Sequence, residues 1–129
     1  EPTMRRIPIH NPCNLEGAPI SAIFPGDEYK AITEREEVQL VDPADQDLTY
    51  AEVLNVWVGP LAHVPAMLLE MAHDPLQRSF AGAFMHLVAR RATQETVINQ
   101  ETVVSLLVLR PKASTLIRPT LNDIKRASR

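Results

Sequence analysis

Three segments of the chain carry the hydrophobic pattern of β-strands. Residues 37–41 alternate polar with apolar side chains, which is the period of a strand with one solvent-facing side. Residues 48–58 form a long run of strand-forming residues that contains the single tryptophan, and residues 101–109 form a second apolar run. Gly59-Pro60 and Arg110-Pro111 follow these runs and are expected to end them. The pattern predicts a strand in each segment.

Between the second and third of these strands, the apolar period changes to that of a helix. Apolar residues at 67–71 fit a first stripe, and Asp74-Pro75 both breaks this helix and caps the next one. A second stripe recurs at helical spacing and consists of Leu76, Phe80, Ala83, Phe84, Leu87 and Val88. We expect a two-helix insertion between residues 64 and 91, with its apolar stripe in the core.

The ends of the chain lack such periodicity. Prolines at positions 8, 12 and 19 predict an irregular N-terminal arm over residues 1–18, and residues 20–24 are expected to form a short helix or turn. Residues 112–129 combine proline, serine and basic side chains, which is typical of a mobile tail or of a short docking helix at 121–127. Residues 1–3 precede Met4 and are expected to come from the expression vector, with Met4 as the natural start.

These elements predict a single α+β domain. Its 129 residues are 45% apolar, which is enough for one hydrophobic core but not for two. We expect residues 19–111 to form a small, mostly antiparallel β-barrel of about five or six strands, curved or closed, with the helical insertion covering one side. Cys13 is the only cysteine, and no apolar run approaches the length of a membrane span. We therefore expect a cytoplasmic protein with no membrane contact.

The net charge of −3 is unevenly distributed. Residues 112–129 carry a balance of +4, which leaves −7 for residues 1–111. Nine carboxylates lie between Asp27 and Glu52, where Lys30 and Arg35 are the only cations. Lysine and arginine contacts to phosphates dominate non-specific affinity for nucleic acids, so the acidic body argues against a protein that coats duplexes. A small site for one nucleoside remains compatible with this charge.

The segment Gly26–Arg35 contains the candidate chemistry. If Ala31–Arg35 is extended, Thr33 and Arg35 share one face, and Lys30 lies at the mouth of the strand after a Pro-Gly turn. An ammonium, a hydroxyl and a guanidinium would then converge on one small polar or anionic ligand.

The motif Lys30-x-x-Thr33-x-Arg35 after a glycine turn resembles the signature of the ASCH superfamily, small β-barrels related to the PUA domain. The order of the predicted elements over residues 19–111 is similar to that of the family. The sequence departs from the family in two respects. Gly26 lies four residues before the lysine rather than two, and Glu70 is not at the place where the family has its catalytic glutamate. The resemblance implies a PUA-like barrel with a ligand cleft between barrel and helices.

Two activities are implied by this resemblance. Members of the family are thought to bind RNA or nucleotides, and Tyr29 and Trp57 would be the aromatic side chains that stack on a base. One branch hydrolyses the acetyl amide of N4-acetylcytidine, which would make Lys30 and Thr33 a base and nucleophile pair. Glu70 would supply the third catalytic group. His73 and Asp74 lie nearer its expected place in the sequence and are further ligand-binding candidates.

Other interpretations follow from the same residues. On an exposed strand, the charges of Lys30 and Arg35 would simply be solvated, and the protein would be a non-enzymatic interaction module that uses the acidic face or the basic tail. An exposed Lys30 with no pocket beside it would favour this alternative. The spacing Glu70-x-x-His73 and the aspartates at 42, 45 and 47 lack the further ligands that a metal site needs. We expect neither a metal nor another cofactor.

Overall fold

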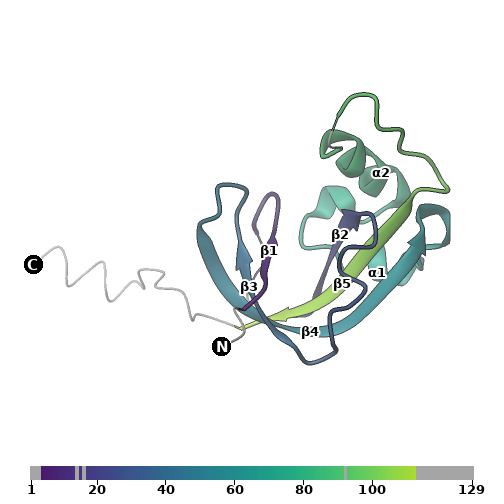
Figure 1. Cartoon of the computed structure of the whole chain (residues 1–129). Coiled ribbons are helices and arrows are strands. Elements are labelled where there is room, and N and C mark those ends of the chain that lie inside the picture. The colour runs from purple at the N-terminus through teal and green to yellow at the C-terminus, as the bar shows by residue number, and fades with distance from the viewer. Residues whose placement is uncertain (1–3, 14, 16, 92, 113–129) are drawn as a thin grey trace, which may run out of the picture.

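The computed structural model describes residues 4–13, 15, 17–91 and 93–112. Five strands form one sheet in the order β1-β3-β4-β5-β2 (Figure 1). They are β1 Arg6–Pro8, β2 Ile20–Pro25, β3 Glu37–Val41, β4 Asp47–Pro60 and β5 Val103–Pro111. β1 pairs with β3 in parallel, and all other neighbours are antiparallel. The predicted α+β class is confirmed, and the sheet is mostly antiparallel.

The sheet is not closed into a barrel, because its pairing leaves β1 and β2 as the two edges. The expected arm includes β1, which pairs three residues with β3 despite Pro8. The expectation of a helix or turn at 20–24 is wrong. This segment is β2, which pairs with β5 along its whole length. Its residues are buried from Ile20 to Phe24, so it shows no polar and apolar alternation.

Both faces of the sheet are covered, and β5 is the wall between two hydrophobic cores. Every residue from Val104 to Leu109 is buried. Leu107 and Leu109 pack with β1, β2, β3 and β4 side chains, whereas Leu106 and Val108 pack with the helical region. The register of β4 against β5 shifts between Val53 and Asn55, which is the mark of a β-bulge. The bulge bends β4, the longest strand.

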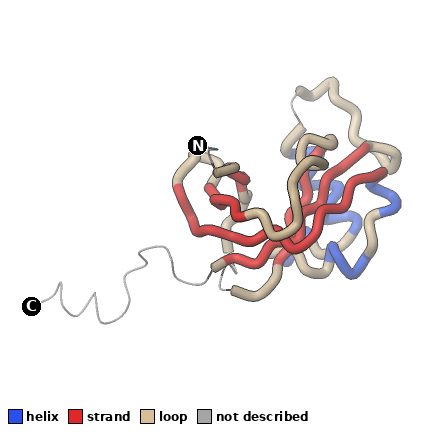
Figure 2. Tube along the Cα trace, turned by 60° about the horizontal axis from the view of Figure 1, so that its bottom comes forward, coloured by secondary structure: helices blue, strands red, loops and turns tan. Residues whose placement is uncertain are grey.

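The helices gather on one side of the sheet (Figure 2). They are the 3₁₀ helix η1 Leu61–His63, α1 Ala66–Leu69, the 3₁₀ helix η2 Pro75–Gln77 and α2 Phe80–Ala89. The predicted insertion is therefore present, but its first helix is a single α-helical turn. Asp74 accepts a hydrogen bond from the Leu76 amide and Pro75 follows this cap, as expected, but they begin only the short η2. The second helix expected to start there, α2, begins at Phe80 after the N-cap Ser79. No helix in the described part of the chain is long and apolar enough to cross a membrane.

The acidic segment and the start of the basic tail meet at the sheet. Arg6 forms ion pairs with Asp45 and Asp47 at 3.0 and 2.7 Å, Arg5 pairs with Glu36, and Lys112 pairs with Glu37. These exposed pairs offset part of the negative charge, and each contributes little to stability. Residues 113–129, where the tail or docking helix is expected, lie outside the described residues.

Candidate functional site

The Gly26–Arg35 segment is a loop of consecutive turns, so the expected extended conformation of Ala31–Arg35 is wrong. The Lys30 amide donates to the Asp27 carbonyl at 3.1 Å, and the Ile32 amide donates to the Tyr29 carbonyl at 3.1 Å. Arg35 adopts a left-handed conformation with φ 70°, and its amide donates to the Val53 carbonyl of β4 at 2.6 Å. The backbone conformation of this segment is therefore set by turn hydrogen bonds and by the bond from Arg35 to β4, rather than by the strand propensity of its residues.

The motif side chains face solvent. The Lys30 side chain is 68% exposed, and its Nζ lies 3.2 Å from the carboxylate of Asp27. Thr33 and Arg35 are also exposed. The two larger hollows described below are lined by α2 and the segment that follows it. These positions agree with the alternative interpretation of the motif, in which the charges of Lys30 and Arg35 are solvated.

The two expected stacking residues lie on opposite faces of the sheet. Tyr29 packs edge-on against Phe24, with ring centroids 4.8 Å apart, in the core that contains Leu107. Its burial raises the pKa of the phenol to about 12. Trp57 packs against the other core, beneath the helices. One base therefore cannot be held between these two rings.

Glu70, His73 and Asp74 are close in sequence but have different surroundings. Glu70 is exposed at the end of α1, next to Met71, whose carbonyl accepts from the Ser21 amide near the start of β2. Lys30 and Thr33 instead follow the far end of β2. Within the described residues, Lys30 is hydrogen-bonded to Asp27 and not to Glu70. The structure does not bring the three expected catalytic groups into contact.

His73 and Asp74 are buried where the N-terminal arm meets the helical insertion. His73 Nε2 lies 2.7 Å from the His10 carbonyl oxygen, and the Cys13 thiol lies 3.3 Å from the His73 carbonyl oxygen. The side-chain Nδ2 of Asn11 donates to the Asp74 carboxylate at 3.0 Å, and this bond is the main cause that lowers the pKa of the Asp74 carboxyl. These contacts join the arm to the segment between α1 and η2.

His86 of α2 completes this junction. Its ring lies 5.6 Å from that of His10, measured between centroids. The hollow between them, which His73 also lines, has a volume of about 10 Å³, enough for about one water molecule. No group of three or more histidine, cysteine or acidic residues in the described part of the chain is arranged to hold a metal ion. The junction therefore has the character of a structural contact.

Acidification is expected to weaken the fold through His86. Burial is the main cause that lowers the pKa of this imidazole from 6.5 to about 4, and His10, His73 and Arg90 add to it while Asp74 opposes it. Between these values the unfolded chain binds a proton that the folded chain excludes, so the free energy of unfolding falls as the pH falls from 6.5 to 4. We expect a loss of about 1–2 kcal/mol, because solvent screens this half-buried group.

Urea denaturation at pH 7, 5.5 and 4 would measure this loss. His86→Gln should reduce the slope of stability against pH, whereas His63→Gln, at an exposed position, should leave it unchanged. Equal slopes in the His86 variant and the parent protein would contradict the assignment.

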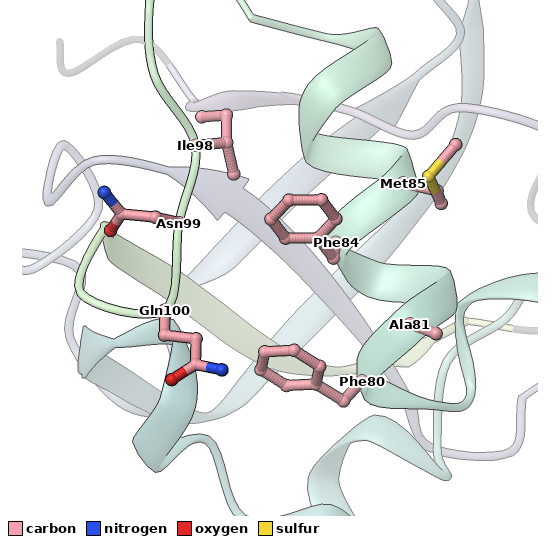
Figure 3. A pocket seen from close by; sticks show the side chains of 7 residues that line it. All are labelled: Phe80, Ala81, Phe84, Met85, Ile98, Asn99 and Gln100. Atoms are coloured by element: carbon pink, nitrogen blue, oxygen red, sulfur yellow. The ribbon is translucent and has the colours of Figure 1, made fainter.

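An apolar groove with a volume of about 480 Å³ lies between α2 and residues 98–100. Phe80 and Phe84 point from α2 toward this segment, and the Gln100 carboxamide points toward the Phe80 ring (Figure 3). The Asn99 side chain is turned away, and its carbonyl oxygen accepts from the Glu101 amide at 2.8 Å. Gln100 is exposed and supplies the polar group nearest the rings.

The sequence did not single out this groove. Ala83 and Leu87 of the predicted apolar stripe are buried as expected, but Phe80 is 40% exposed and Phe84 is partly exposed. These two rings lie four residues apart and therefore on the same side of α2. In the sequence, the apolar stripe of α2 is fully accounted for by packing in the core. The groove becomes apparent only in the structure, where residues 98–100 lie beside the two rings.

Comparison with known proteins supplies a fold but no family. No family model matches the chain, and no curated protein matches its sequence. The structure is similar to that of protein EF3133 from Enterococcus faecalis V583, of the family model DUF984, with a TM-score of 0.56 and 11% identity. The match covers 72% of this chain and 60% of that chain. At this identity, the similarity establishes a shared fold alone.

Proposed function

We propose that the chain binds a nucleobase-bearing ligand in the groove between α2 and residues 98–100. The observation that carries the proposal is the pair of part-exposed rings, Phe80 and Phe84, beside the free end of Gln100. The volume of about 480 Å³ lies in the range of small-ligand sites, which are mostly apolar with a few polar groups.

The chemistry of this groove favours a planar heterocycle over an aliphatic ligand. Every base has a π-face that stacks on a phenylalanine ring. The carboxamide of Gln100 offers one acceptor and two donors in one plane, which match the hydrogen-bonding edge of a base. As the finer fold assignment we propose an ASCH-like domain whose sheet is curved but open, which is supported by the mostly antiparallel sheet, its β4 bulge and the helices on one face.

An amide chemical-shift titration with adenosine, cytidine and N4-acetylcytidine tests the proposal. We expect shifts at residues 80–85 and 98–100. Phe84→Ala should weaken binding about 5- to 150-fold, because a stacked base contributes about 1–3 kcal/mol. Leu76→Ala is the matched control, since Leu76 is exposed near α2 but outside the groove. Phe80→Leu keeps an apolar side chain without a ring and separates lost stacking from lost folding.

The other candidate functions give different results in the same titration. Shifts confined to residues 29–35, with release of cytidine from N4-acetylcytidine, would favour the amidohydrolase of Lys30, Thr33 and Glu70 and overturn the groove. Lys30→Ala should not affect binding if the groove is the site. No shift with any nucleoside would contradict the proposal and leave the protein-interaction module, whose exposed Lys30 fits the solvated alternative.

A further inference from the structure

A second hollow lies at the C-terminal end of α2, with a volume of about 430 Å³. It is lined by Val88 and Ala89 of α2 and by Arg91, Thr93 and Gln94 after the helix. Both hollows present a carboxamide, but this one also presents a cation and a hydroxyl. No carboxylate of the described residues forms an ion pair with Arg91.

The two hollows follow the same side of α2. Phe80, Phe84 and Val88 form one row at intervals of four residues, and the first two line the groove whereas the third lines the second hollow. Ala81, Met85 and Ala89 form a second row with the same spacing, in which the first two residues line the groove and Ala89 lines the second hollow. Since each helical residue rises 1.5 Å, Phe84 and Val88 are about 6 Å apart along the axis. The polar hollow is therefore one helical turn beyond the aromatic rings.

We infer that the ligand is a nucleotide whose phosphate is bound at Arg91 while its base lies against Phe84. This inference rests on the proposed function. The guanidinium carries five donors in a planar fork that matches phosphate oxygens, and an ion pair to phosphate makes these hydrogen bonds stronger than neutral ones. Gln94 supplies a neutral donor beside it, and so does Thr93 when its hydroxyl, which lies 3.1 Å from that of Thr96, is the acceptor in that pair.

Arg91 also has a simpler role that the experiment must separate from phosphate binding. A cation after the last turn of a helix interacts favourably with the negative end of the helix dipole, and Arg90 does so as well. Arg90 is the C-cap of α2 and is exposed, but it does not line the second hollow. It is therefore the matched control for Arg91, with the same charge at the same end of the helix.

The experiment is calorimetric titration of the full chain with adenosine, adenosine monophosphate and inorganic phosphate. We expect the monophosphate to bind about 10-fold more tightly than adenosine, in line with a charge-assisted contact. In Arg91→Gln this ratio should fall to about one, and in Arg90→Gln it should be retained. Because the ratio compares two ligands on one protein, partial loss of folding does not change it.

Equal affinities for adenosine and its monophosphate would overturn the inference and leave the proposed function intact. No binding of either would overturn the proposed function itself. An equal fall of the ratio in the two arginine variants would show that the phosphate is attracted by the local positive charge and not by a site at Arg91. This result would also overturn the inference. Adenylyl-adenosine, whose phosphate joins two nucleosides, identifies the source of the phosphate. If this dinucleotide binds more tightly than the monophosphate and loses that advantage in Arg91→Gln, the subsite is supported and single-stranded RNA is its ligand.

Discussion

Replacement of Gly82 by alanine is expected to destabilise the protein by about 1–3 kcal/mol, although alanine is the better helix former. A Cβ at this position would lie 1.7 Å from the Leu76 carbonyl oxygen and 2.9 Å from its carbonyl carbon. Both atoms belong to the backbone of η2, so no side-chain rotation relieves the overlap. The propensity gain of about 1 kcal/mol does not offset a forced separation of α2 from η2.

Chemical denaturation monitored by circular dichroism would measure this loss. Ala81→Gly, at an exposed position of the same helix, provides the reference for pure backbone propensity and should cost about 1 kcal/mol. A Gly82→Ala protein more stable than its parent would show that the close approach of η2 to α2 is incorrect.

Leu106→Ala and Leu107→Ala are each expected to cost about 2–5 kcal/mol of the free energy of unfolding. These neighbours point to opposite faces of β5 and are both fully buried, one against the helices and the other in the core of the curved sheet. A sheet with one wet face would tolerate the substitution at one of the two positions.

The same denaturation measurements check this prediction. Val103→Ala is the control, because Val103 begins the same strand and is 44% exposed, and its cost should be well below that of either leucine. A cost below about 1 kcal/mol at either leucine would mean that one face of β5 is not a packed core.

Strong periodicity made part of the fold predictable. Residues 37–41 were predicted and observed as β3, the strand predicted at 48–58 is β4, and the strand predicted at 101–109 is β5. β2 was missed because burial on both faces removes the alternation that identifies a strand. β1 was missed because it has three residues, one of them proline, and depends on pairing with β3. Whether the sheet closes into a barrel depends on pairing between segments that are distant in the sequence, and no local pattern encodes this pairing.

The candidate site was less predictable for a related reason. The residues of the Lys30 motif are adjacent in sequence, but turns and the bond from Arg35 to Val53 determine where their side chains point. His73 and Asp74 were placed in a ligand site because they lie near the expected place of the third catalytic group, whereas their polar groups are bonded to the arm. The groove is formed where Phe80 and Phe84 of α2 face residues 98–100, and this arrangement exists only in the folded chain.

The position of β5 also affects how the chain acquires its structure during synthesis. This strand is the last described element to leave the ribosome, yet it lies between β4 and β2 in the sheet. Until residues 103–111 emerge, β2 and β4 lack a shared partner and both cores lack their common wall. The nascent chain would therefore expose apolar strand edges until these residues emerge, and chaperones bind such surfaces. Tertiary folding of this domain is expected to begin only once β5 has left the ribosome.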